Sequence, residues 1–100
     1  MKLGLIINSD SFTDVIINLT QSAVSKEKEV RLFFMDEGTK LLENQNIIAL
    51  SSLEKVSMSF CEYSAKKNHI NFMDLPKKIK KGSQINNAIM NQSSDKVLVF

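Results

Sequence analysis

The chain has 100 residues, of which 43% are hydrophobic, enough for the core of one small domain and too many for a disordered chain. Its 13 basic and 11 acidic side chains leave a formal net charge of only +2. Its apolar runs are far shorter than the ~20 residues that cross a bilayer, and no signal-peptide pattern is visible. A single cysteine excludes an intramolecular disulfide and cysteine-cluster zinc sites, so we expect a cytoplasmic protein without membrane association.

Strands and helices alternate in the first half of the chain. Residues 2–7 are an apolar run with β-branched side chains, typical of a buried strand. Residues 8–11 (NSDS) then supply turn formers and candidates for a helix N-cap. Residues 30–35 predict a second strand. Between the two, apolar side chains at three- and four-residue spacing predict an amphipathic helix through Phe12, Val15, Ile16, Leu19, Ala23 and Val24.

The middle of the chain contains one well-defined strand. Residues 36–38 (DEG) end the second strand, and residues 39–44 fit a short helix. Residues 47–50 fit either a brief strand or a buried turn. Residues 55–60 alternate in polarity, which predicts a strand with Val56, Met58 and Phe60 on one face and Ser57, Ser59 and Cys61 on the other.

The last third of the chain is read as a helix, a basic turn, a helix and a strand. Residues 62–68 fit a short helix that Asn68 would cap in a left-handed conformation. Residues 70–73 extend briefly, and Pro76 opens the basic turn. A last helix is predicted to begin near residues 82–83, and residues 96–100 form an apolar strand. The apolar face of this last helix would carry Ile85, Ala88 and Ile89.

Apolar strands separated by helices are typical of a mostly parallel sheet that is covered on both faces. We therefore predict one three-layer α/β/α domain over residues 1–100, with a mostly parallel sheet of about five strands. In such sheets, ligands bind beyond the carboxyl ends of the strands. Residues 8–11, residues 36–38 and Cys61 all follow a predicted strand. The candidate pocket around Cys61 comprises Asn8, Ser9, Asp36, Gly38, Ser59 and Ser64.

Cys61 is the principal candidate for chemistry. Because a strand ends and a helix begins there, its sulfur would face free backbone N–H groups and the positive end of the helix dipole, which stabilise the nucleophilic thiolate. Ser59 and Ser64 are placed to donate hydrogen bonds to it, whereas the adjacent Glu62 opposes its negative charge. The alternative is a small buried side chain, a common environment for a free cysteine. Residues 61–64 (CEYS) also resemble a C-x-x-C redox motif without its second cysteine, which leaves mixed disulfides or persulfides as the available chemistry.

Three segments together resemble the DsrE/DsrF-like sulfur-relay family. Residues 33–38 (FFMDEG) look like its aromatic-aromatic-x-Asp-Gly segment, with Glu37 as an extra residue. Residues 56–65 (VSMSFCEYSA) are similar to its strand, cysteine and Ser-Ala helix, and residues 95–100 (DKVLVF) to its final strand. The resemblance implies a cytoplasmic α/β domain that assembles as trimers or hexamers. It also implies a persulfide carrier on Cys61, a component of sulfur transfer that needs no metal or organic cofactor.

A basic segment is the second feature of the sequence. Residues 66–81 contain six lysines and one acid, Asp74, a sum of +5 in a chain whose other residues sum to −3. The simplest interpretation is a solvated face. Nucleic-acid binding is not supported, because Phe72 is the only aromatic residue there and no recognition motif occurs. An acidic protein that donates or accepts sulfur fits better, through charge steering.

The remaining polar residues receive structural interpretations. His69 is expected to cap the carbonyls of the preceding helix, and Asp36 and Glu37 to form a turn rather than a carboxylate pair. Residues 8–13 resemble a flavodoxin phosphate loop, but Asp10 and Asp14 would repel a phosphate, so FMN binding ranks third. The sequence thus predicts a sulfur carrier. The alternative is a non-catalytic oligomeric module with a structural cysteine.

Overall fold

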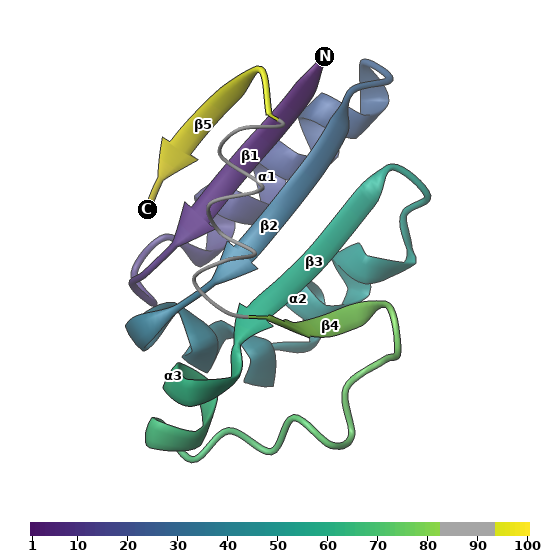
Figure 1. Cartoon of the computed structure of the whole chain (residues 1–100). Coiled ribbons are helices and arrows are strands. Elements are labelled where there is room, and N and C mark those ends of the chain that lie inside the picture. The colour runs from purple at the N-terminus through teal and green to yellow at the C-terminus, as the bar shows by residue number, and fades with distance from the viewer. Residues whose placement is uncertain (83–93) are drawn as a thin grey trace.

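Five parallel strands form one sheet in the computed structural model, which describes residues 1–82 and 94–100 (Figure 1). The order across the sheet is β4-β3-β2-β1-β5, and every pairing is parallel. This confirms the predicted α/β class and parallel sheet. The strands are β1 (Lys2–Ile7), β2 (Glu29–Phe34), β3 (Val56–Cys61), β4 (Ile79–Gly82) and β5 (Lys96–Val99).

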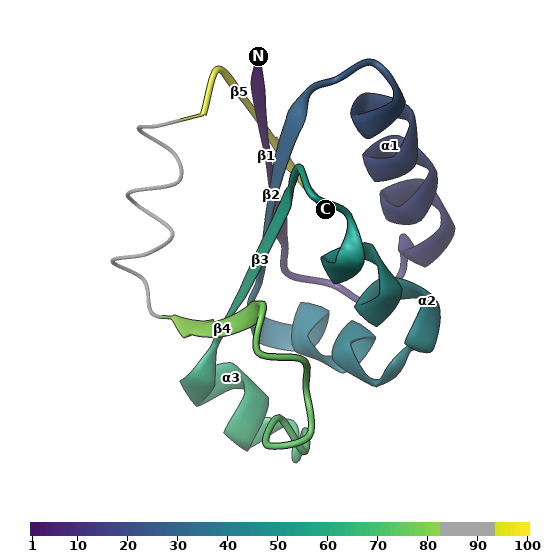
Figure 2. The same ribbon diagram turned by 90° about the vertical axis from the view of Figure 1, so that its right-hand side faces the viewer.

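Helices α1 and α2 cover one face of the sheet, and α3 lies beyond the carboxyl end of β3 (Figure 2). The described helical segments are α1 (Thr13–Ser25), the 3-10 helix η1 (Asp36–Glu43), α2 (Gln45–Ala49), the 3-10 helix η2 (Leu50–Ser52) and α3 (Glu62–Lys67). The helix predicted to begin near residues 82–83 falls on residues outside these ranges. No helix within the described ranges is long and apolar enough to span a bilayer.

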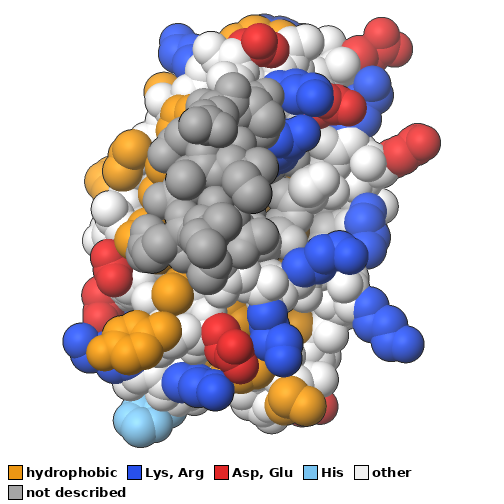
Figure 3. All heavy atoms as spheres, in the orientation of Figure 1, with side chains coloured by type: hydrophobic (Ala, Val, Ile, Leu, Met, Phe, Trp, Pro, Cys, Tyr) orange, Lys and Arg blue, Asp and Glu red, His pale blue; other side chains and the backbone are white. Residues whose placement is uncertain are grey.

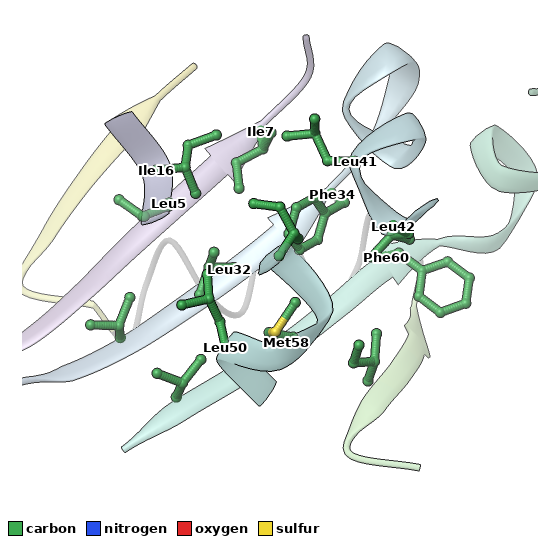
Figure 4. Packing of buried hydrophobic residues seen from close by; sticks show 14 of the residues in the cluster. Leu5, Ile7, Ile16, Leu32, Phe34, Leu41, Leu42, Leu50, Met58 and Phe60 are labelled. Atoms are coloured by element: carbon green, nitrogen blue, oxygen red, sulfur yellow. The ribbon is translucent and has the colours of Figure 1, made fainter. Parts of the chain in front are cut away.

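The main core lies between the sheet and the helices on this face (Figure 4). It is built mainly from alternate residues of the three central strands, such as Leu5, Ile7, Leu32, Phe34, Met58 and Phe60. Ile6, Phe33 and Cys61 form a second, smaller cluster, because neighbouring residues of a strand point to opposite faces. The predicted alternation of β3 is therefore confirmed.

Three segments differ from the predictions. Residues 47–50 are helical, because Asn44 caps α2 by accepting the N–H of Asn46 at 2.8 Å, and because Ile47 and Leu50 share one buried side of the helical turn. The basic segment contains β4, which the sequence pattern concealed because only Ile79 of its four residues is buried. Residues 70–73 form no strand.

The ends of α1 and α3 correct the predicted caps. The polar side chains of residues 8–11 do not cap α1, whose N-cap is Phe12 without a side-chain hydrogen bond. The left-handed residue after α3 is His69, with φ of 58°, and not Asn68. The N–H groups of His69 and Ile70 bond to the carbonyls of Lys66 and Ala65, the pattern of a Schellman motif. The backbone of His69 therefore terminates the helix.

Candidate functional site

The carboxyl ends of β1, β2 and β3 lie at one edge of the sheet. Ile7 pairs with Phe34, and Phe34 pairs with Phe60. The segments that follow these strands therefore meet at this edge, as the sequence predicted. Because β2 separates β1 from β3, Cys61 lies two strand spacings from the end of β1, about 10 Å.

Cys61 is the last residue of β3 and the N-cap residue of α3, with extended backbone angles (φ −77°, ψ 115°). Its side chain is 7% exposed and packs in the cluster with Ile6 and Phe33, against which Met35 and Val97 also lie. No cap hydrogen bond from the helix backbone reaches its sulfur. The thiol therefore lies at the predicted strand-to-helix junction, in an apolar environment just below the surface.

The loop after β2 has a strained but well-supported conformation. Asp36 adopts a left-handed backbone with φ of 49°, which is uncommon outside glycine, asparagine and aspartate. Thr39 Oγ1 donates to the carbonyl oxygen of Asp36 at 2.9 Å, and Asn68 Nδ2 donates to the same oxygen at 2.8 Å. Asn68 also donates to Thr39 Oγ1 at 3.0 Å. One amide side chain thus joins this loop to α3.

Gly38 occupies a place where no other residue fits without movement. A Cβ atom there would lie 2.0 Å from the backbone carbonyl oxygen of Ile7. The absence of a side chain therefore lets η1 pack directly against the end of β1. Asp36 and Glu37 open this 3-10 turn, and the Glu37 carboxylate pairs with Lys40. The hydrogen bond and charge of Glu37 raise the pKa of Lys40 above its usual 10.5.

A pocket of about 250 Å³ lies between η1 and α3. Two of the sequence-predicted residues, Asp36 and Ser64, line it, whereas Asn8, Ser9, Gly38 and Ser59 are not part of its wall. Tyr63, Lys67 and Asn68 also line this pocket, although they were not among the predicted site residues. The spacing of these residues could have indicated the pocket, because positions 63, 64, 67 and 68 share one face of a helix. The full lining is Asp36, Glu37, Tyr63, Ser64, Lys67 and Asn68.

The other predicted pocket residues have separate surroundings. The N–H of Asn8 donates to the carbonyl of Phe100 at 2.8 Å, at the switch point between β1 and β5 where ligands often bind in such sheets. The rings of Phe12 and Phe100 meet there, with centroids 5.9 Å apart. Ser9 Oγ is buried beside this point without a partner within the described part of the chain. Ser59 is half-buried on β3.

The lysines of the basic segment lie on α3, in the turn before β4 and on β4 itself. Lys66 lies on α3 and pairs with Glu62 at 3.4 Å. Lys80 and Lys81 are exposed on β4, an edge strand, and Lys78 Nζ donates to the carbonyl of Leu53 at 3.2 Å. Lysine and arginine side chains gather on the β4 side of the sheet face seen in Figure 3. Within residues 1–82 and 94–100, no group of three or more His, Cys, Asp and Glu side chains is arranged to hold a metal ion.

Comparison with known proteins supports the fold. No family model and no curated protein matches the sequence. Among solved structures, MTH1491 from Methanobacterium thermoautotrophicum, a protein of unknown function, superposes with a TM-score of 0.75 and 12% identity, over 99% of this chain and 98% of its own. The YchN protein from E. coli superposes with a TM-score of 0.71 and 20% identity, over the full length of both chains. The chain therefore shares the DsrE/DsrF-like fold of these two proteins.

Proposed function

We propose that this protein is a sulfur carrier that holds a persulfide on Cys61 and exchanges it with partner proteins. The observation that carries the proposal is the place of Cys61, at the carboxyl end of a parallel strand and at the junction with α3. This is the edge at which parallel α/β sheets bind their ligands. The DsrE/DsrF-like fold and the motif around Cys61 support the same role.

The proposed step is a sulfur exchange without net oxidation. The Cys61 thiolate attacks the outer sulfur of a donor persulfide, R–S–SH. A new S–S bond forms on Cys61 while the S–S bond of the donor breaks. The donor leaves as R–S⁻, and Cys61 becomes Cys–S–SH. In the second transfer, an acceptor thiolate attacks the outer sulfur of the Cys61 persulfide, and Cys61 leaves as a thiolate. Neither transfer therefore requires an added oxidant.

Partner recognition is proposed to use the exposed lysines around β4. Lys77, Lys80 and Lys81 are exposed there and would attract an acidic donor or acceptor protein. We further propose that the chain assembles with itself as a trimer or hexamer, because a domain of this size leaves much apolar surface exposed. Met73 and Val99, for example, are 81% and 62% exposed.

A structural role for Cys61 is the second candidate function, and the burial of the thiol favours it. Only 7% of the residue is exposed, and its neighbours Ile6 and Phe33 are apolar. In this alternative the domain is a non-catalytic oligomeric module, and Cys61 fills a space that a larger or more polar side chain would disturb.

Intact mass spectrometry separates the two candidates. The folded protein is incubated with inorganic polysulfide and measured before and after dithiothreitol. A sulfur carrier gains one or two sulfur atoms, loses them on reduction, and gains none as the Cys61→Ser variant. A structural cysteine gains none in the folded wild type and is alkylated only after unfolding. Light scattering checks the assembly, and a monomer at micromolar concentration would contradict it.

A further inference from the structure

A slot lies between the C-terminal end of α1 and the edge of the sheet formed by β1 and β5. Its larger apolar side chains are Leu3 of the main core, Leu19 and Leu98, which pack against that core, and the exposed Met1. Its volume is about 200 Å³, equal to about seven water molecules. The slot lies at the amino ends of β1 and β5, whereas Cys61 lies at the carboxyl edge of the sheet. The two sites are therefore separated by the length of a strand, about 20 Å.

Three lysines line the rim of this slot. Lys26 and Lys28 follow Ser25, the last residue of α1, and Lys96 is the first residue of β5. No acidic side chain is part of the lining. Across the described residues, no ion pair or side-chain hydrogen bond engages any of the three ammonium groups.

The nearest acids in the sequence do not neutralise these lysines. Asp95 precedes Lys96, but its carboxylate accepts the backbone N–H of Lys2 at 2.7 Å. The Glu29 carboxylate lies 4.0 Å from Lys2 Nζ. Both acids are therefore directed to Lys2, outside the slot. Glu27 is exposed, and it too is absent from the lining.

The backbone holds the lysines at the rim. After α1, the N–H of Glu27 bonds to the carbonyl of Val24, and the N–H of Lys28 bonds to the carbonyl of Ala23. These two bonds form a Schellman motif that places Lys28 against Ala23, a wall residue of the slot. Because the last carbonyls of α1 are thus occupied by N–H groups, they oppose an incoming anion less than bare carbonyls would.

From this arrangement we infer that the slot binds a small carboxylate with a short aliphatic chain. The carboxylate would lie among Lys26, Lys28 and Lys96, and the chain would cover Leu3, Leu19 and Leu98. A carboxylate of roughly six carbons matches the volume of about seven water molecules, whereas the chain of a long fatty acid would extend out of the slot into solvent. Apolar burial and charge pairing each contribute, so the ligand needs both parts.

The test is a titration of the full chain with hexanoate, followed by ¹H–¹⁵N NMR. We expect saturable shifts at residues 19–28 and 96–98, with a Kd of about 1 mM or tighter. Acetate carries the charge without the chain, and hexanol carries the chain without the charge. Each should bind at least about tenfold more weakly. Equal binding of hexanol, or shifts centred elsewhere, would overturn the inference.

Matched variants separate binding from folding. The Lys26→Gln, Lys28→Gln double variant should weaken hexanoate binding at least about fivefold with an unchanged melting temperature, since exposed charges contribute little to stability. The Lys77→Gln, Lys80→Gln double variant removes two charges elsewhere and should bind like the wild type. Ser22→Leu, which places a larger side chain in the wall of the slot, should abolish hexanoate binding. Unchanged binding in both slot variants would refute the proposed site.

Discussion

Asn68 joins α3 to the loop after β2, because its Nδ2 donates to the carbonyl oxygen of Asp36 at 2.8 Å. Asp36 has a left-handed backbone, and this hydrogen bond is one of two that its carbonyl oxygen accepts. This hydrogen bond therefore ties the loop to the helix that begins after Cys61.

Replacing Asn68 with alanine should destabilise the fold by about 1 kcal/mol, because the carbonyl of Asp36 and the hydroxyl of the buried Thr39 lose their shared donor. Chemical denaturation measures the loss, and NMR should show shifts at residues 36–39. Asn71→Ala is the control, since Asn71 bonds within its own exposed turn. An equal effect of the two substitutions would contradict the proposed link.

Gly38→Ala should destabilise the fold by about 3 kcal/mol or more, since its Cβ would lie 2.0 Å from the backbone oxygen of Ile7 and backbone must move. Gly4→Ala is the matched comparison. There the Cβ would meet Ser94 Oγ at 2.9 Å and Ser94 Cβ at 3.2 Å, contacts with one side chain that a small shift of Ser94 relieves, so the cost should be smaller, about 1 kcal/mol. Thermal unfolding of the two variants ranks them, and the reverse order would refute this account.

Glycine at either Schellman position should stabilise the protein. Glu27 and His69 have φ of 61° and 58°, a conformation that disfavours any residue with a Cβ. Glu27→Gly and His69→Gly should each add about 0.5–1 kcal/mol to the free energy of unfolding. Lys67→Gly, within the last turn of α3, should instead cost about 1 kcal/mol. A loss of stability in both cap variants would argue against these left-handed caps.

The pair of Glu37 and Lys40 predicts a pH effect with a definite sign. Glu37 raises the pKa of Lys40 above 10.5, so any stabilisation from this pair is complete below that pH. It disappears as the pH rises through the raised pKa. An NMR titration of the Lys40 side chain should show the raised pKa, and Glu37→Gln should lower it toward 10.5, because Glu37 is its main cause. An unchanged titration in that variant would exclude Glu37 as the cause.

The lysines of β4 should protect an exposed sheet edge. Lys80 and Lys81 lie on a four-residue edge strand, where charge discourages pairing with another chain. Replacing both with valine should produce larger, concentration-dependent particles in light scattering. The same replacement of Lys66 and Lys67 on α3 should not, because a helix presents no unpaired strand edge. Aggregation of both variants alike would assign the effect to lost charge alone.

Much of the architecture could be predicted from local pattern. The strands 2–7, 30–35 and 55–60 and the long first helix carry clear periodicities, because each has one side or both in the core. The junction at Cys61 was visible for the same reason. β4 was not, since an edge strand with one buried residue has no hydrophobic period, and the short helix α2 was obscured by its length.

Sequence alone determined the parallel α/β class and the position of Cys61 at the end of a strand, since the spacing of apolar residues along the chain indicates which residues are buried. Only the tertiary structure decided how deep the thiol lies and which residues share a pocket. Both depend on strand order: β2 separates Cys61 from Asn8, while Asn68 reaches Asp36 across 32 positions of the chain. Contacts of that range arise from packing, for which local periodicity carries no signal.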